Sequence, residues 1–275
     1  MKTLGTAIAL QNKSISAIID TFGAKMTSLV VDGHEMLYFD DDDVSHSGIP
    51  ICMPSFGVPS EGNGIHLGQH GFFRDFEFDV LEQGTDQVTL GLSSKPEMKS
   101  MYPFDFSATI TYELTDFGAK LTLGMKNEGD KALPVAPGVH PYFAVSDADN
   151  IIVTTPATTG NDNTAGYAEI PLKDSAFFQE TTDSSGQSAY RVCGAPDYHF
   201  MDHEGKISME CGGRRVTVSH DSRAFKRTTV WRKTELEGYV CIEPSFVRQG
   251  ILTDPIVVSP GDEWKTDVEF SLEII

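Results

Sequence analysis

The chain has 275 residues, of which 40% are hydrophobic and 22% are charged, and its formal net charge is −19. A chain of this length can bury a large core without disulfides, and a strongly acidic chain lacks the basic face that nucleic acids and anionic membranes attract. We therefore expect no nucleic-acid partner and no membrane partner. No composition break or repeat divides the sequence, which predicts a single domain over residues 1–275.

The four cysteines, Cys52, Cys193, Cys211 and Cys241, form no C-x-x-C pair and match no zinc-site spacing. They are predicted to be reduced thiols, most of them buried. Residues 1–5 lack the apolar run of a signal peptide, and no stretch approaches the length of a membrane helix. These features favour a cytoplasmic protein. The acidic run 40–43 is most simply a solvated loop.

Alternation of apolar and polar residues with period two is the main pattern of the chain, and it is typical of half-buried strands. It predicts strands over 76–80, 88–92, 108–114, 121–125, 207–218 and 264–274, with turns at 32–33, 84, 115–118 and 212–213. The charged stretch 222–237 is the least strand-like, and a short helix is expected there. The pattern predicts an all-β protein, a large antiparallel β-sandwich.

The first segment that interrupts this pattern runs from residue 45 to residue 76. It is rich in glycine, proline and histidine, and a loop of this length in a compact domain is usually functional. His70 and Arg74 lie at its end, just before a predicted strand. The structural alternative is that Arg74 pairs with Asp75 or Asp79, and that His70 only caps the strand.

Two further segments carry polar residues at the ends of buried strands. His140 precedes a proline in residues 136–143 (APGVHPYF), which holds it in an extended conformation, although a satisfied core histidine is equally compatible with this pattern. Glu243 interrupts the apolar run 239–246 (YVCIEPSF), so its carboxylate must be paired, solvated by a cleft, or functional. A histidine and a glutamate at such positions suit general acid–base catalysis near pH 6 to 7.

Several segments resemble the aldose 1-epimerase, or galactose mutarotase-like, family, in the family's order and over nearly the whole chain. Residues 70–74 (HGFFR) resemble its H-G-F-x-R, residues 138–143 (GVHPYF) the segment with its catalytic histidine, and residues 241–243 (CIE) its C-[IVL]-E with the catalytic glutamate. Residues 196–200 (PDYHF) fall where the family has an aspartate that holds sugar hydroxyls. Residues 48–57 (GIPICMPSFG) are close to a motif of the branch that includes hexose-6-phosphate epimerases.

The resemblance implies a galactose mutarotase-like β-sandwich and an isomerase that needs no cofactor and no metal. It implies that Glu243 takes the proton of the anomeric hydroxyl, that His140 protonates the ring oxygen, and that His70 stabilises charge near that oxygen. Asp197 then binds sugar hydroxyls, and Arg74 orders the pocket or contacts the substrate. The ring opens to the free aldehyde, rotates and closes again on the other face.

One departure from the phosphorylated-sugar branch concerns His46. That branch usually has an arginine before its G-G-I-P, and His46 occupies this position here. A histidine is a poorer phosphate ligand than a bidentate arginine, and the net charge of −19 also disfavours a dianionic substrate. We therefore expect an unphosphorylated aldohexose as substrate, with His46 among the residues that bind it.

Other interpretations stay open at this point. The basic residues between 223 and 233 either face the pocket, which would favour a hexose-6-phosphate 1-epimerase, or form an exposed polar face. A non-catalytic carbohydrate-binding protein could use the same fold, as could a glycoside hydrolase or lyase with Asp197 as a second acidic group. The expected partner is a small sugar, and the expected assembly is a monomer or a weak dimer.

Overall fold

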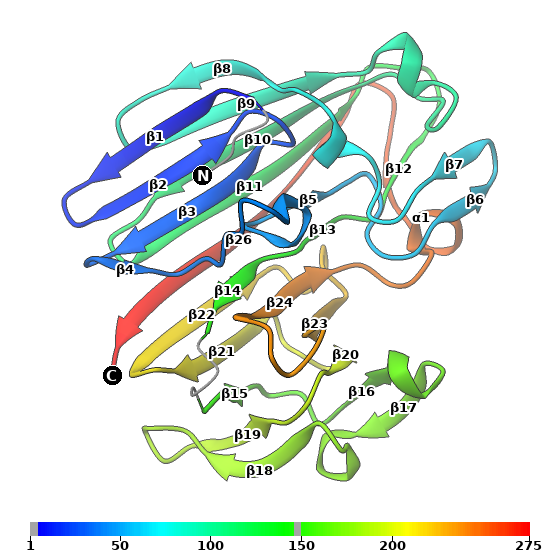
Figure 1. The fold of residues 1–275 in the computed structure, drawn as a ribbon. Helices are drawn as coiled ribbons and strands as arrows, with labels where there is room; N and C mark the ends of the chain where they lie inside the picture. The colour runs from blue at the N-terminus through cyan, green and yellow to red at the C-terminus, as the bar shows by residue number, and fades with distance from the viewer. Residues whose placement is uncertain (1–4, 146–149) are drawn as a thin grey trace.

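The computed structural model describes residues 5–145 and 150–275, and most of its elements are β-strands (Figure 1). The largest sheet has ten antiparallel strands. In spatial order they are β18 (Phe178–Thr182), β19 (Ser188–Val192), β15 (Ile152–Thr154), β21 (Lys206–Cys211), β22 (Arg214–His220), β26 (Glu263–Ile274), β11 (Gly118–Asn127), β10 (Phe106–Leu114), β9 (Gln87–Ser93) and β8 (Asp79–Gln83).

Two smaller sheets cover this one. A six-stranded sheet has the order β14 (Tyr142–Ala144), β24 (Tyr239–Ser245), β23 (Arg227–Trp231), β20 (Asp197–Phe200), β16 (Thr159–Asp162) and β17 (Ala168–Pro171). A four-stranded sheet has the order β1 (Ala7–Asn12), β2 (Ile15–Asp20), β3 (Lys25–Val31) and β4 (His34–Glu35).

Short pairs and turns complete the described chain. The strand pairs are β12 (Leu133–Val135) with β25 (Ile256–Val258), β13 (Gly138–Val139) with β5 (Ile51–Cys52), and β6 (Ser60–Gly62) with β7 (Ile65–Leu67). The helical turns are α1 (Gly250–Thr253) and the 3-10 turns η1 (Val44–His46), η2 (Phe73–Asp75), η3 (Pro96–Met98), η4 (Asn163–Ala165) and η5 (Leu172–Asp174). No helix of the described residues is long and apolar enough to cross a membrane.

The core lies between the layers, as the alternation predicts. In β26, Val268 and Phe270 are buried while Asp267 and Glu269 are exposed. The ring of Phe143 from β14 packs against Phe270, with 6.2 Å between the ring centroids. In Figure 1 the smaller sheets accordingly lie in front of the ten-stranded sheet. The prediction of an antiparallel β-sandwich is confirmed.

Two predictions about local structure are wrong. The stretch 222–237 contains no helix; it contains the strand β23, which pairs with β20 on one side and with β24 on the other. The β-branched run Thr228, Thr229 and Val230 favours a strand, and burial between two neighbours outweighs the charged flanks. The strand predicted from residue 76 begins at Asp79, because, of the residues before it, only Glu77 forms a bridge, to Phe22, which lies outside the ten-stranded sheet.

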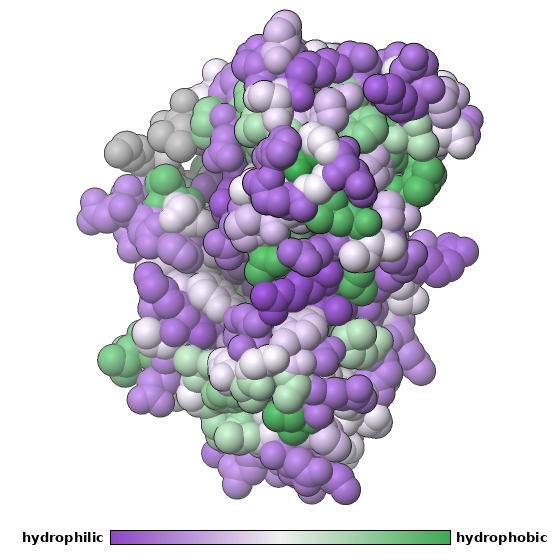
Figure 2. Space-filling model, turned by 90° about the vertical axis from the view of Figure 1, so that its right-hand side faces the viewer, coloured by the Kyte–Doolittle hydropathy of each residue, from purple (hydrophilic) through white to green (hydrophobic). Residues whose placement is uncertain are grey.

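The surface and the cysteines agree with the composition. Cys52, Cys211 and Cys241 are buried, Cys193 is partly exposed, and none of these four described residues forms a disulfide. The face in Figure 2 shows apolar residues in small groups separated by polar ones. On this face, therefore, polar residues separate the exposed apolar residues, as a chain with a net charge of −19 leads one to expect.

Candidate active site

One face of the six-stranded sheet forms the floor of a cavity. Successive side chains of a strand point to opposite faces. In β23 and β24, Val230 and Ile242 therefore join the core between the sheets, whereas Thr229 and Glu243 line the cavity. A cavity of about 580 Å³ results, which lies in the range of small-molecule sites.

Strand register brings polar side chains from distant parts of the chain into rows on this floor. His199 of β20 pairs with Thr229 of β23, and Thr229 pairs with Glu243 of β24. In the next row Asp197 pairs with Trp231. The predicted residues Asp197 and Glu243 thus lie on one surface although 46 positions separate them in sequence, the difference between 243 and 197.

The glycine-rich loop of residues 45–76 lines the opposite side of the cavity. The pairing of Cys52 with Gly138 attaches it to the strand that leads to His140. His70 and Gly71 both have a positive φ, and a Cβ atom on Gly71 would lie 2.2 Å from the carbonyl oxygen of Met53. Only glycine fits that position, and the tight turn it permits directs His70 into the cavity.

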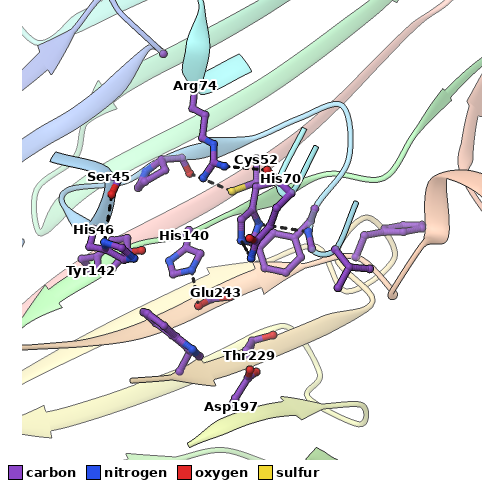
Figure 3. A pocket seen from close by; sticks show the side chains of 18 of the residues that line it. Ser45, His46, Cys52, His70, Arg74, His140, Tyr142, Asp197, Thr229 and Glu243 are labelled. Carbon is purple, nitrogen blue, oxygen red and sulfur yellow. Dashed lines mark hydrogen bonds and ion pairs between the residues drawn. The ribbon is translucent and has the colours of Figure 1, made fainter. Parts of the chain in front are cut away.

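His140 and Glu243 meet at the bottom of the cavity (Figure 3). The distance from His140 Nε2 to Glu243 Oε1 is 3.1 Å, and only 2% of the Glu243 surface is exposed. The imidazole stacks on Tyr142, with 4.7 Å between centroids and 14° between planes. Apart from this contact with His140, Glu243 Oε1 has no partner within the described residues, so nothing competes with His140 for this oxygen.

Burial shifts these two groups in opposite directions. Loss of solvent, assisted by the charge of Asp197, raises the pKa of Glu243 well above its usual value. Loss of solvent, assisted by His70, lowers the pKa of His140 well below its usual value. Both shifts favour the neutral forms, that is, a proton on the Glu243 carboxyl and a neutral His140 ring. Transfer of that proton to His140 creates a carboxylate base and an imidazolium acid.

Glu243→Gln is expected to raise thermal stability, and more so at higher pH. In the unfolded chain this carboxyl ionises near pH 4.3, whereas the fold keeps Glu243 protonated to a higher pH. The free energy of unfolding of the wild type therefore falls as the pH rises from that value towards the pKa of the folded state. A glutamine side chain does not titrate, so the variant does not show this fall. Melting temperatures at pH 5 and pH 8 measure this, and we expect a gain of about 2–4 °C at pH 8. A variant that melts below the wild type at both values would contradict the assignment.

His70 lies beside the pair, with its ring 5.4 Å from that of His140 and at 85° to it. Its Nδ1 accepts a hydrogen bond from the backbone N–H of Gly57, which places the proton of the neutral ring on Nε2, 3.3 Å from the side-chain amide of Gln69. Burial, reinforced by the charge of Arg74, lowers the pKa of His70 to about 4. His70 is thus a neutral N–H donor near pH 7, suited to an oxygen that gains charge.

Asp197 is held as an ionised acceptor. Burial alone would raise its pKa, but hydrogen bonds from His199 and Asn163, together with the charge of Arg248, hold that pKa below the usual value. Asn163 Nδ2 donates to Asp197 Oδ2 at 2.7 Å, and His199 Nε2 lies 3.2 Å from Oδ1. The other nitrogen of His199 lies 2.8 Å from Thr229 Oγ1. Sequence reasoning missed His199, although it lies two positions from Asp197 and so on the same strand face.

Arg74 lines the cavity and supports His70 through the main chain. Its Nη2 donates to the carbonyl oxygen of Gln69 at 2.9 Å. Among the ion pairs of the described residues, none joins Arg74 to Asp75 or Asp79. The role of Arg74 in ordering the pocket stays a prediction.

His46 also lines the cavity, on the side of Trp231. Its Nδ1 lies 2.7 Å from Asp43 Oδ2, and its ring stacks on the indole of Trp231 at 6.3 Å. The carboxylate of Asp43 makes this corner unfavourable for a phosphate. The aromatic residues that line the cavity are Phe22, Phe56, Tyr142, Tyr167, Trp231 and Phe246.

Arg227 is a second residue that sequence reasoning did not single out. Of the five basic residues between 223 and 233, all in the described part of the chain, it alone lines the cavity. It is 7% exposed, its Nε has no hydrogen-bond partner, and its guanidinium lies 5.1 Å from the ring centroid of Tyr167. Arg248 lies 5.5 Å from the same centroid. Burial, with the charge of Arg248, lowers the pKa of Arg227 to about 10.

Comparisons with known proteins show which family the chain belongs to. Residues 6–271 match the sequence model of the family described as aldose 1-epimerase. A protein of Cenchrus ciliaris, provisionally named glucose-6-phosphate 1-epimerase, is 25% identical over 286 aligned positions, which cover 94% of this chain and 82% of that protein.

Two solved structures share the fold. The Slr1438 protein of Synechocystis sp. PCC 6803 superposes with a TM-score of 0.84 and 21% identity, covering 98% of this chain and 96% of that one. A galactose mutarotase-like protein of Lactobacillus casei gives 0.80 and 19%, with 98% and 100% covered. The fold is therefore galactose mutarotase-like, and the match over residues 6–271 shows that the chain belongs to the aldose 1-epimerase family.

Proposed function

We propose that this protein is a mutarotase that interconverts the α and β anomers of a free aldohexose. The observation that carries the proposal is the His140–Glu243 pair, 3.1 Å apart and buried on the floor of a sugar-sized cavity. The chemistry of anomer exchange requires one proton to leave the anomeric hydroxyl and one to reach the ring oxygen. A pair that shares a single proton supplies both functions.

The proposed reaction begins with proton transfer from Glu243 to His140. Ionised Glu243 then takes the proton of the anomeric hydroxyl while His140 protonates the ring oxygen, and the bond between the anomeric carbon and that oxygen breaks. The aldehyde rotates about its bond to the next carbon. Closure on the other face returns both protons to the sugar, and transfer of one proton from His140 back to Glu243 restores the starting state of the protein.

The surrounding residues hold the sugar for these transfers. His70 Nε2–H would donate to the ring oxygen or its neighbour, where charge develops. The ionised Asp197 would accept hydrogen bonds from hydroxyl groups, because Asn163 and His199 fix its orientation. The exposed edge of the Trp231–His46 stack would pack against the sugar ring.

Polarimetry tests this proposal directly. Freshly dissolved α-D-glucose and α-D-galactose are followed with and without protein. Faster approach to the equilibrium rotation with either sugar supports the proposal. A rate equal to that of buffer for both sugars would rule out the free-sugar version.

A hexose 6-phosphate is a second candidate substrate, favoured by Arg227 and Arg248. Burying an unpaired guanidinium next to another one is unfavourable unless an anion compensates it. Both guanidinium groups adjoin the ring of Tyr167 at one end of the cavity, so a phosphate there would reach both. The name of the Cenchrus ciliaris relative points to the same substrate class.

Arg227→Met is expected to raise KM for a hexose 6-phosphate by about 10- to 100-fold, the loss expected for charged hydrogen bonds of about 1.5–3 kcal/mol. KM for the free hexose should change far less. Steady-state rates with both sugars measure the difference. The control is Arg223→Met, which removes an exposed arginine outside the cavity. Equal effects of Arg227→Met on both sugars would argue against a phosphate at this end.

A further inference from the structure

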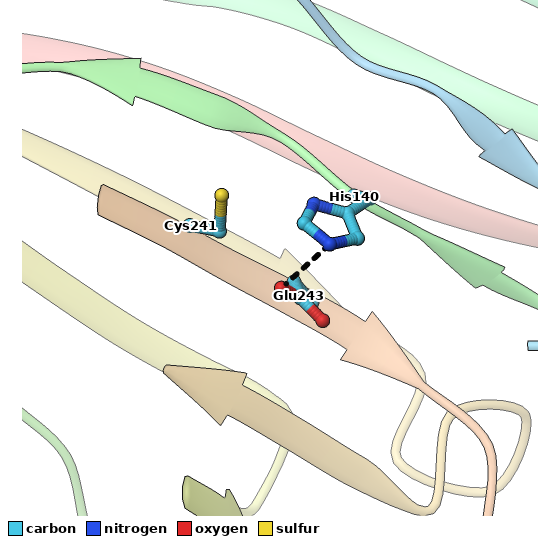
Figure 4. Close-up of side chains that lie close together, drawn as sticks. All are labelled: His140, Cys241 and Glu243. Atoms are coloured by element: carbon cyan, nitrogen blue, oxygen red, sulfur yellow. Dashed lines mark ion pairs between the residues drawn. The ribbon is translucent and has the colours of Figure 1, made fainter. Parts of the chain in front are cut away.

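Cys241 takes no part in the proposed proton transfers, yet its thiol adjoins them. It lies two residues before Glu243 on β24, so both side chains leave the same face of the strand, and His140 lies above them (Figure 4). Ligand atoms of His140, Cys241 and Glu243 all lie within 4.8 Å of one another, and all three residues are buried.

These three atoms are the donor types that zinc selects. Zinc is typically held by imidazole nitrogen, thiolate sulfur and carboxylate oxygen, and its open sites have three protein ligands and one free position. Bonds of about 2.0–2.3 Å in tetrahedral geometry place the ligand atoms about 3.3–3.6 Å apart. The contact of 3.1 Å between His140 and Glu243 is already close to this value. Rotation of the Cys241 side chain and a small shift of the His140 ring would bring the other pairs of ligand atoms to these distances.

The charges favour a divalent ion. An ionised carboxylate and an ionised thiolate are each costly in a buried position, but a dication between them gives a cluster with no net charge. Glu243 Oε1 is buried and, within the described residues, contacts only His140 Nε2, which belongs to the same set of ligand atoms, so a metal ion would displace no further partner of this oxygen. His140 and Glu243 line the cavity, which leaves the fourth position open towards it. Magnesium and calcium, which prefer six or more oxygen ligands, do not suit this set.

We propose that His140, Cys241 and Glu243 form a binding site for one Zn²⁺ ion, and that its occupation switches the enzyme off. The bound ion engages the carboxylate and the imidazole at once, so neither can exchange a proton with a sugar. This site lies beside the proposed catalysis, and its existence does not depend on the sugar that is turned over.

Cobalt binding tests the site without reference to activity. The full chain is titrated with Co²⁺ alone, and the near-ultraviolet absorption of a thiolate–cobalt bond is recorded. We expect one equivalent to bind, Zn²⁺ to displace it, and the band to vanish in both Cys241→Ser and Cys241→Ala. Cys193→Ser, which removes the partly exposed thiol, should keep the band. No thiolate band in the wild type, or a band lost with Cys193 and kept without Cys241, would overturn the proposal.

Inhibition by Zn²⁺ tests the second part of the proposal, that the bound ion switches the enzyme off. The anomer-exchange rate should fall as Zn²⁺ is added, return with a chelator, and be unaffected by Mg²⁺. Relative to its own metal-free rate, Cys241→Ser should need at least about tenfold more Zn²⁺ for the same inhibition. Cys211→Ser, a buried thiol outside the cavity, should behave as the wild type. Equal Zn²⁺ sensitivity of the Cys241 variants and the wild type would contradict the site. If no sugar is turned over, the cobalt titration still shows whether the metal site exists.

Discussion

Glu243→Gln is expected to lower kcat for anomer exchange by about 10²- to 10⁴-fold, the range typical of a lost general acid–base group. Glutamine keeps the size of the side chain but can neither take the proton of the anomeric hydroxyl nor give it back. The carboxylate is 2% exposed, so water cannot easily replace it. Steady-state polarimetry at several sugar concentrations measures the loss.

The Glu243 experiment needs two controls. Glu210→Gln changes another buried glutamate, which is paired with Arg215 and does not line the cavity, and should leave kcat nearly unchanged. Melting curves show whether each variant is folded. A folded Glu243→Gln protein with wild-type kcat would contradict the role given to this residue.

His140→Gln is expected to have an effect of similar size, about 10²- to 10⁴-fold on kcat, because the ring oxygen loses its proton donor. The wild type should show a bell-shaped pH profile. Its rate falls at low pH, when the pair takes up a second proton, and at high pH, when it loses its only one. In the variant the residual rate depends on ionised Glu243 alone, whose pKa burial raises, so it should rise with pH.

This pH profile separates catalysis from structure. Steady-state rates between pH 5 and pH 9 are compared for the wild type, His140→Gln and His220→Gln; the last changes a half-buried histidine of β22 outside the cavity. The third protein should keep the bell shape. A bell-shaped profile in His140→Gln would show that His140 is not a member of the titrating pair.

The β-sandwich could be predicted because its signal is local. The alternation along residues 264–274 depends only on which side chains face the core, and the structure buries Val268 and Phe270 as expected. The strand β23 was missed because its formation depends on the strands that pair with it. Its pairing with β20 and β24 gives Thr228 and Val230 a buried environment that the charged flanks concealed.

The candidate site was predicted in part. His70, His140 and Glu243 were indicated by polar residues in apolar or glycine-rich surroundings, and the structure brings them into one cavity. His199 was missed, and Arg227 was not distinguished from the other basic residues between 223 and 233, because their positions follow from strand register. A single sequence does not reveal which residue of β20 pairs with which residue of β23.

Exchange NMR at equilibrium tests the central claim most directly. Signals of the α and β anomeric protons are recorded for free aldohexoses and their 6-phosphates, with the wild type and with Glu243→Gln. We predict exchange cross-peaks between the two anomers of at least one sugar with the wild type, and a buffer-like rate with the variant. Sugars that bind the wild-type protein but exchange no faster than in buffer would contradict the account and leave a carbohydrate-binding protein on this fold.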